Sequence, residues 1–333
     1  MFLTLVVLAL IYAFLNGYRD SSSILAGVIA SRSMKPRLAL YLVAAADLIS
    51  PFFFGLAVAR SIATGLIDLS MINLQTIVIA MFSAVLWSLF SWWQGIPSSS
   101  THAMIGGLLG AALIEHGPSV IVLSGLAYVV LPLLLAPIIG FLAAFLGMKI
   151  LILLFAHATP KINITFRRIQ IFTMVTLAMS NSSNDAQKSM GIIAIGLLLA
   201  GKTSSFTIPF WVIVICAVAL ALGASRGDWR QIRTLGRNIY LIQPSNALVS
   251  QLTSTGLIFI ASALGMPVST PHVISSALIG AGASERLNKV RWQVAGEMVT
   301  TWMLTIPATM IVSSMLFMVM TGLNTIANFI HQI

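Results

Sequence analysis

Long apolar stretches separated by short polar ones run through the whole chain. They approach or exceed the about 20 residues that a helix needs to cross the hydrocarbon of a bilayer. They are apolar on every side instead of alternating with polar residues, which favours helices over strands. The stretches lie at residues 1–16, 38–59, 74–93, 119–148, 208–224, 239–264 and 292–320. With further crossings in the mixed segments between them, we predict an all-α polytopic membrane protein of about 10–12 transmembrane segments.

The composition agrees with a membrane protein, and the placement of the basic residues indicates how the chain is oriented in the membrane. Hydrophobic residues make up 58% of the chain, charged residues 8%, and the mean hydropathy is +1.00, unlike a soluble domain. The net charge of +10 would suit a nucleic-acid partner, but most Lys and Arg residues fall between the apolar stretches. They cluster at residues 32–37, 149–168, 226–237 and 286–291. We read these clusters as a topology signal, expect the lipid bilayer as the partner and expect no nucleic acid.

The four basic clusters predict how the chain is threaded, because positively charged connections favour the cytoplasmic side. With all four there, the N-terminus and the C-terminus lie outside and the first half crosses an odd number of times. The second half then runs in the opposite direction, as in transporters with inverted-topology repeats. We predict a first repeat at 1–148, a cytoplasmic linker at 149–169 and a second repeat at 170–333, all in the cell (plasma) membrane.

One polar phrase is written twice, once in each predicted repeat. The copies, at residues 95–102 and 265–272, share the pattern Gly-x-Pro followed by Ser and Thr and then His. Pro followed by hydroxyl residues and an apolar run is typical of a helix N-terminus, whose hydroxyls and free N–H groups bind oxyanions. Two such starts that enter from opposite faces, as broken helices or re-entrant hairpins, would surround one anion near the membrane midplane.

The candidates for substrate contact are the hydroxyls and imidazoles of these two copies. They are Ser99, Ser100, Thr101, His102, Ser269, Thr270 and His272. Each hydroxyl could instead cap its own helix, and each histidine could be a packed helix residue with one nitrogen satisfied. A histidine here could also carry the coupling proton. The residues alone leave these readings open.

A second duplicated element, a polar stretch that contains an aspartate, lies near the start of each half. The stretches are 16–23, with Asp20, and 181–189, with Asp185. Asn, Ser and Gly offer the backbone other hydrogen bonds, so we predict that the helix breaks in both places. A buried aspartate at membrane depth is by default functional. The alternative is simple neutralisation, with Arg19 beside Asp20 and with Lys188 three residues after Asp185.

Four separated phrases resemble the inorganic phosphate transporter (PiT) family. They are Trp92–Ala103, Asn184–Ala194, Gly265–His272 and Leu287–Trp292, and they keep the family's order over nearly the whole chain. The resemblance implies a secondary transporter that takes up inorganic phosphate with sodium or protons. It also implies that the hydroxyl-rich helix starts help to hold phosphate.

By position, the resemblance makes Asp20, Asn184 and Asp185 candidates for ion coupling, together with Ser23 and Gln251. The chain departs from the family's pattern near these residues. Arg19 precedes Asp20, Ser23 stands where the family carries Asn, and Gln251 stands where relatives commonly carry Glu. These departures remove cation ligands or negative charge, so they leave the coupling ion open between sodium and the proton.

The function expected from the sequence is therefore import of inorganic phosphate by cation symport, with alternating access around a central oxyanion site. A divalent anion entering a cell at −100 mV faces roughly 4.6 kcal/mol, so accompanying cations are needed. We expect no enzymatic activity, no metal site and no cofactor beyond the coupling ion; a homodimer is left open. A permease for sulfate or another oxyanion, or a passive anion channel, remains the alternative.

Overall fold

The computed structural model describes residues 1–95, 98–235 and 240–331, which are almost entirely helical. The first half contains α1 (Phe2–Ala30), α2 (Pro36–Ile49), α3 (Ala57–Gly65), α4 (Leu74–Gln94), α5 (Ser100–His116) and α6 (Leu123–Leu154). The second half contains α7 (Ile162–Leu199), α8 (Phe210–Arg226), α9 (Trp229–Arg233), α10 (Pro244–Ala263), α11 (Thr270–Glu285) and α12 (Trp292–His331). Ile96 and Pro97 of the first repeated phrase, and Arg237 of one basic cluster, lie outside the described residues.

Several of the described helices are long and apolar enough to cross a membrane. Five pass this test: α1, α4, α6, α10 and α12. A sixth span is formed if α2 and α3 are counted together, although the pair is bent by 74° between them. The apolar α8 is shorter, at 17 residues. The predicted all-helical membrane architecture is confirmed, and the predicted run at 38–59 proves to be this bent pair.

The two halves hold each other by equivalent contacts. The helix α6 packs along α11 of the other half, and α12 packs along α5. Glycine permits the close approach in both places, because a Cβ at Gly110 would lie 2.3 Å from the Met310 carbonyl oxygen and one at Gly280 would lie 2.2 Å from that of Phe141. Small residues of this kind let membrane helices approach closely. The matched contacts give the molecule an approximate twofold arrangement.

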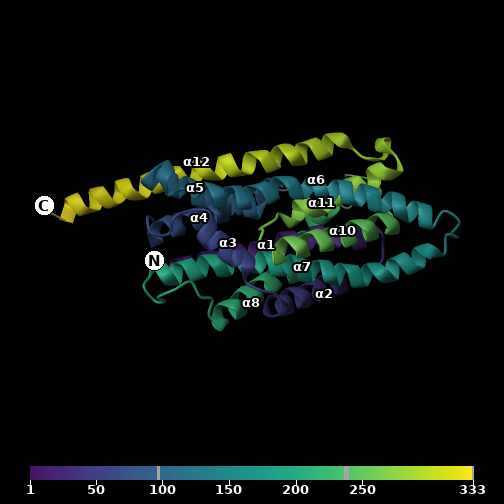
Figure 1. Cartoon of the computed structure of the whole chain (residues 1–333), viewed down its shortest axis with the longest axis horizontal. Coiled ribbons are helices and arrows are strands. Elements are labelled where there is room, and N and C mark those ends of the chain that lie inside the picture. The colour runs from purple at the N-terminus through teal and green to yellow at the C-terminus, as the bar shows by residue number, and fades with distance from the viewer. Residues whose placement is uncertain (96–97, 236–239, 332–333) are drawn as a thin grey trace.

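Figure 1 shows the helices lying along one long axis. The helices α5, α6 and α12 follow one side, α2 and α8 follow the other, and α1, α7, α10 and α11 lie between them. Both chain termini lie at one end of the molecule, and the turn between α6 and α7 lies at the opposite end, which we call the linker end. That turn falls within the predicted linker, whose remaining residues extend α6 and α7.

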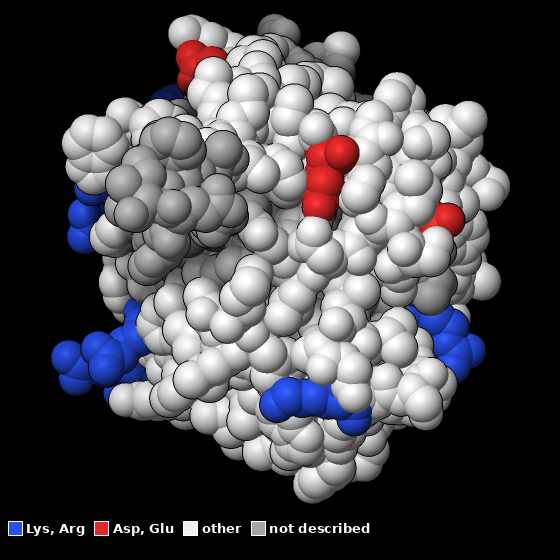
Figure 2. Space-filling model, turned by 90° about the vertical axis from the view of Figure 1, so that its left-hand side faces the viewer, with Lys and Arg blue, Asp and Glu red and all other residues white. Residues whose placement is uncertain are grey.

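Charge differs between the two ends of the molecule. Each basic cluster contributes a side chain to one cavity at the linker end, namely Arg32, Arg167, Arg233, Lys289 and Arg291. Figure 2 views the opposite end, where the surface is mainly uncharged, with isolated acidic patches and basic groups toward its edges. The four clusters thus lie on one side of the molecule, as their spacing predicts, while the assignment of that side to the cytoplasm stays a prediction.

The predicted helix breaks at residues 16–23 and 181–189 are wrong. The helices α1 and α7 run through both stretches without interruption. Hydroxyls bond back to the helix's own carbonyls, as from Ser22 Oγ to Tyr18 O at 3.2 Å and from Ser183 Oγ to Ser180 O at 2.8 Å. Both stretches are buried inside the protein, so their polar groups meet one another and not lipid. A continuous helix therefore satisfies its backbone there.

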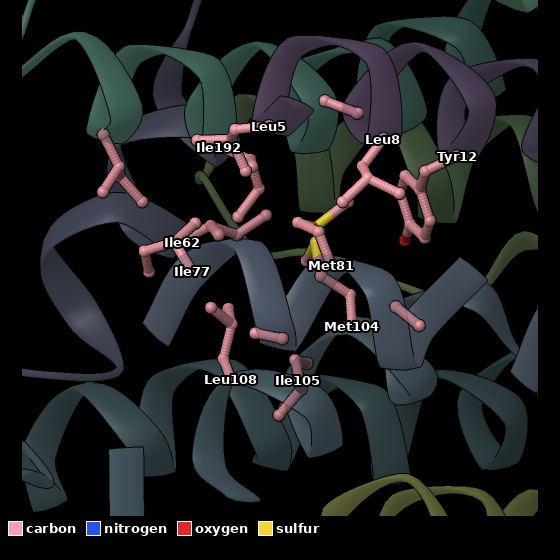
Figure 3. Close-up of a cluster of buried hydrophobic side chains, with 14 of the residues drawn as sticks. Leu5, Leu8, Tyr12, Ile62, Ile77, Met81, Met104, Ile105, Leu108 and Ile192 are labelled. Carbon is pink, nitrogen blue, oxygen red and sulfur yellow. The ribbon is translucent and has the colours of Figure 1, made fainter. Parts of the chain in front are cut away.

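A buried apolar cluster fixes the first hairpin against α1. Figure 3 shows Leu8 of α1 beside Met81 of α4 and Met104 of α5, with Leu5 of α1 beside Ile192 of α7 and Tyr12 at the edge of the group. Each of these side chains is at most 8% exposed. Burying such a side chain contributes about 1.5–3 kcal/mol. The cluster holds the start of α5 at a fixed depth beside α1.

A glutamate ties the two helices of each hairpin together at its open end. In the first hairpin, Glu115 of α5 accepts hydrogen bonds from Asn73 Nδ2 at 2.6 Å and from the Thr76 hydroxyl. In the second, Glu285 of α11 accepts from Asn246 Nδ2 at 2.5 Å and pairs with Lys289. The clamps leave the two hairpin tips as the parts that face the molecular centre.

Candidate functional site

The starts of α5 and α11 meet in the interior of the molecule. The Thr101 hydroxyl donates to the Val268 carbonyl at 3.2 Å, and the rings of His102 and His272 are 4.9 Å apart. The preceding turns approach from opposite sides. Gly95 lies against Arg230 of α9, and Gly265 lies against α3. Both glycines have positive φ, 72° and 74°, which closes a tight turn that other residues rarely adopt.

The two returning helices are too short to cross the bilayer alone. At 1.5 Å per residue, α5 is about 25 Å long and α11 about 24 Å, against roughly 30 Å of hydrocarbon. They begin together at the centre and run toward opposite ends of the molecule. This is the hairpin arrangement expected from the repeated phrase. The positive ends of both helix dipoles therefore point at one place.

Lys188 of α7 links this place to both hairpin tips. Its ammonium donates to the Thr101 hydroxyl at 2.7 Å, to the Val268 carbonyl at 3.1 Å and to the Asp185 carboxylate. The side chain is fully buried. The predicted pairing of Asp185 with Lys188 is therefore present, but it is part of a larger network. The same three oxygens are of the kind that bind hard cations.

Asp20 of α1 lies beside Asp185 and is 2% exposed. The second oxygen of each carboxylate, Oδ2, has no hydrogen-bond partner among the described residues. Arg19, the neighbour expected to neutralise Asp20, points its Nη2 to Ser98, with distances of 2.7 Å to the carbonyl and 3.1 Å to the hydroxyl. Two buried cations and two buried carboxylates thus surround the hairpin tips. The carboxylates keep free capacity for a proton or a cation.

Asn184 positions the second hairpin tip. Its amide nitrogen donates to Ser262 Oγ at 3.0 Å and to the Met266 carbonyl at 3.2 Å, and its oxygen accepts from the Val268 N–H at 3.3 Å. This amide is therefore fully engaged with the protein. Asn181, one turn earlier on α7, is buried and has neither side-chain atom paired in the part of the chain that the structure describes.

The two helix starts differ in how their polar groups are satisfied. Ser99 caps α5 by accepting from the His102 N–H at 3.2 Å. At the start of α11, Ser269 makes no such cap bond, and the hydroxyls of Ser269 and Thr270 have no partner among the described residues. His102 Nδ1 and His272 Nε2 are also unpaired and buried. Buried polar groups without partners are costly, so their concentration here indicates the place of a ligand.

Ser100 and the two remaining candidates have other surroundings. Ser100 lies beside Tyr12 and is 6% exposed. Ser23 accepts a hydrogen bond from Gln231 of α9 at 3.3 Å, and Gln251 accepts from Thr173 of α7 at 2.6 Å. Thr173 lies 12 residues before Asp185, about 18 Å along α7. The contact of Gln251 therefore lies away from the paired aspartates, whereas Ser23 lies three residues after Asp20 on α1, less than one helical turn away.

Some neighbours of the site are not among the candidates named from the sequence, although Ser98 lies within the first repeated phrase. Trp302 of α12 stacks on His272 with ring centroids 4.0 Å apart, and the Ser98 carbonyl accepts a hydrogen bond from Arg19. Asp47 of α2 is buried near Asp185, and both its carboxylate oxygens are without a partner in the described residues. These neighbours come from distant parts of the chain, so only the folded structure brings them together.

The site is closed to bulk water in this conformation. Asp185 and Thr270 are both 0% exposed. A small cavity of about 20 Å³, lined by Arg19, Gly95 and Asp228, approaches from the side of α9. Within residues 1–95, 98–235 and 240–331, no three His, Cys, Asp or Glu side chains form a group that could hold a metal ion. The donors of the closed site are those that suit an oxyanion.

Comparison with known proteins agrees with this chemistry. The model of the phosphate transporter family matches twice, at residues 16–161 and 155–313, and the two matches meet in the turn between α6 and α7. A Rhizobium meliloti protein named "Probable low-affinity inorganic phosphate transporter" is 39% identical over 94% of each chain. A Bacillus subtilis protein of the same name is 38% identical over 91% of this chain and 92% of its own.

A solved structure shares the fold. It is titled "The sodium-dependent phosphate transporter", with a TM-score of 0.88, 21% identity, and coverage of 96% of this chain and 98% of that one. The family is one of transporters, and the expectation that the chain is not an enzyme is confirmed. The two family matches cover both halves of the molecule and both hairpins of the central site, so this chain is a member of the phosphate transporter family.

Proposed function

We propose that this protein imports inorganic phosphate across the plasma membrane by symport with a cation, using the central site between the hairpin tips. The observation that carries the proposal is the meeting of two helix N-termini around buried, unpaired hydroxyls and imidazoles. Neutral donors and helix dipoles hold an oxyanion well and still release it. The names of the relatives support phosphate as that oxyanion.

The coupling cation in this proposal is the proton. The Lys188 ammonium already lies against the carboxylate, hydroxyl and carbonyl oxygens that a sodium ion would use. A sodium ion added there would be repelled by a buried ammonium that it cannot displace. The free oxygens of Asp20 and Asp185 can each take a proton, which adds charge without requiring a coordination shell.

Uptake into liposomes tests the proposal. Purified protein is reconstituted with no internal phosphate, and labelled phosphate is measured under an imposed proton gradient and, separately, a sodium gradient. Accumulation above equilibrium with protons alone is the expected result. Accumulation with sodium alone would overturn proton coupling, and simple equilibration under both gradients would indicate a passive channel. Excess sulfate in the same assay should compete weakly, whereas equal competition would favour a general oxyanion permease.

The contact with phosphate has its own test. Replacing Thr270→Val removes an unpaired hydroxyl at the start of α11 and keeps the side-chain shape. The lost donor should raise the KM for phosphate about 5- to 30-fold, which corresponds to about 1–2 kcal/mol. Thr300→Val, on the exposed face of α12, is the matched control. Equal KM values in the two variants would show that the Thr270 hydroxyl does not contribute to phosphate binding.

A further inference from the structure

A large cavity opens at the linker end, apart from the central site. Its volume is about 970 Å³, near the upper limit for small-molecule sites. The end of α1, the start of α7, α9, the segment 240–244 and the connection into α12 all contribute to its wall. The central site, by contrast, is buried between the hairpin tips. The cavity is thus a separate space built from both halves of the chain.

The charge of the cavity has one sign. Five basic side chains line it, and no Asp or Glu does so among the described residues: Arg32, Arg167, Arg233, Lys289 and Arg291. Lys289 pairs with Glu285, while the four arginines have no carboxylate partner in the part of the chain that the structure describes. Like charges that converge without counterions favour binding of an anion. The guanidinium groups match phosphate oxygens in pairs.

The backbone at Arg32 determines where this side chain leaves the end of α1. With a φ of 54°, it is the one non-glycine residue of the described chain in the left-handed region. This conformation closes the C-terminal turn of α1, where the Ser33 N–H donates to the Val28 carbonyl at 2.9 Å and the Arg32 N–H donates to the Ile29 carbonyl at 3.1 Å. It places Arg32 directly after α1, at the cavity wall. Arg32 is thus held in position by the fold, although glycine would close this turn with less strain.

We propose that the linker-end cavity is a binding site for an anion that carries two or more phosphate groups, distinct from the transport site. The cavity of about 970 Å³ is much larger than one phosphate group, and its four arginines come from four separate segments. An anion with several phosphate groups can reach them together. Two sources supply this chemistry: a soluble polyphosphate and the headgroup of a lipid such as cardiolipin.

The test compares two variants that lose the same charge. The lining variant is Arg32→Gln/Arg167→Gln/Arg233→Gln. The control variant carries Gln at exposed arginines of the same three basic clusters that do not line the cavity: Arg37→Gln/Arg168→Gln/Arg226→Gln. Each full-length protein is placed in phosphatidylcholine nanodiscs and titrated calorimetrically with inorganic triphosphate, and separately with orthophosphate, at constant ionic strength.

Wild type and the control variant should bind one triphosphate per chain, and the lining variant should bind it about tenfold or more weakly. Orthophosphate should not compete at equal concentration. Equal weakening in the two variants, or no saturable binding by wild type, would overturn the proposal. If the lining variant does not fold, the adjacent pair Arg167→Gln and Arg168→Gln gives the same comparison with one charge removed. Only the first should weaken binding.

Two further arms locate the ligand and identify its source. Trp229 lines the cavity, so triphosphate should change the protein's tryptophan fluorescence, and Trp229→Phe should abolish that change. A change that persists in Trp229→Phe would contradict binding at this place. In nanodiscs containing cardiolipin, a lipid ligand would weaken triphosphate binding by wild type but not by the lining variant. Unaltered binding by wild type would assign the site to a soluble anion.

Discussion

Replacing Lys188 tests the buried network that joins α7 to both hairpin tips. Lys188→Met keeps the length of the side chain but removes donors to Asp185, Thr101 and the Val268 carbonyl. It also leaves the fully buried Asp185 carboxylate without its cation. Removing one partner of a buried ion pair costs about 3–5 kcal/mol, because the remaining charge is uncompensated. We expect a loss of unfolding free energy in this range.

A second substitution separates the orphaned charge from the lost hydrogen bonds. In Lys188→Met/Asp185→Asn the carboxylate is neutral, so at least about half of the lost stability should return. The matched control is Lys202→Met, which removes an exposed ammonium over the Phe2 ring, 4.5 Å from its centroid. Such a contact at the surface is worth about 0.5–1 kcal/mol.

The chain provides its own probe of unfolding. Cys216 is its single cysteine and is fully buried in α8. A thiol-reactive dye therefore reports unfolding in detergent as temperature or denaturant rises, without any engineered label. A loss below about 1 kcal/mol in Lys188→Met would show that Lys188 is not the main partner of the Asp185 charge, because water or another group would then already compensate it. A double variant Lys188→Met/Asp185→Asn that is no more stable than Lys188→Met would contradict the same ion pair.

Two further predictions concern the hairpins and use the same probe. Gly110→Ala and Gly280→Ala should each cost about 1–3 kcal/mol, since the added Cβ atoms meet backbone carbonyls, whereas Gly256→Ala, with open space around it, should be neutral or stabilising. Small losses of stability in the Gly110 and Gly280 variants would contradict close packing of the helices at these glycines. Glu285→Leu should cost about 1–3 kcal/mol by removing the carboxylate partner of the buried Asn246 amide, while the exposed Glu297→Leu should change stability by less than about 0.5 kcal/mol. Equal losses of stability in the Glu285 and Glu297 variants would show that Glu285 does not hold the second hairpin together.

The helical membrane architecture and the meeting of the two hairpins follow from features that are local in sequence. Apolar runs predict helices such as α4 and α6, and a duplicated phrase after Gly95 and Gly265 predicts equivalent places in two halves. The course of α1 past Asp20 could not be predicted in this way. A polar stretch weakens a helix in lipid, but α1 and α7 bury their polar stretches inside the protein, and this is a tertiary fact.

The roles of individual side chains are equally dependent on distant contacts. Lys188 reads as a simple partner of Asp185 along one helix, yet it also reaches Thr101 in the other half of the chain. Gln251, matched by position with an ion-coupling residue of the family, contacts Thr173 far along α7. A long flexible side chain can reach several neighbours, and sequence spacing does not show which neighbours are present.

The proposed mechanism requires that the paired aspartates and the hairpin tips form one coupled transport site. The measurement that tests it most directly is accumulation of labelled phosphate by Asp185→Asn in liposomes under an imposed proton gradient. The substitution keeps an acceptor for Lys188 and removes the ionisable group. Accumulation should be lost while the protein remains folded, as reported by protection of Cys216. Accumulation at the wild-type rate would contradict the proposed mechanism.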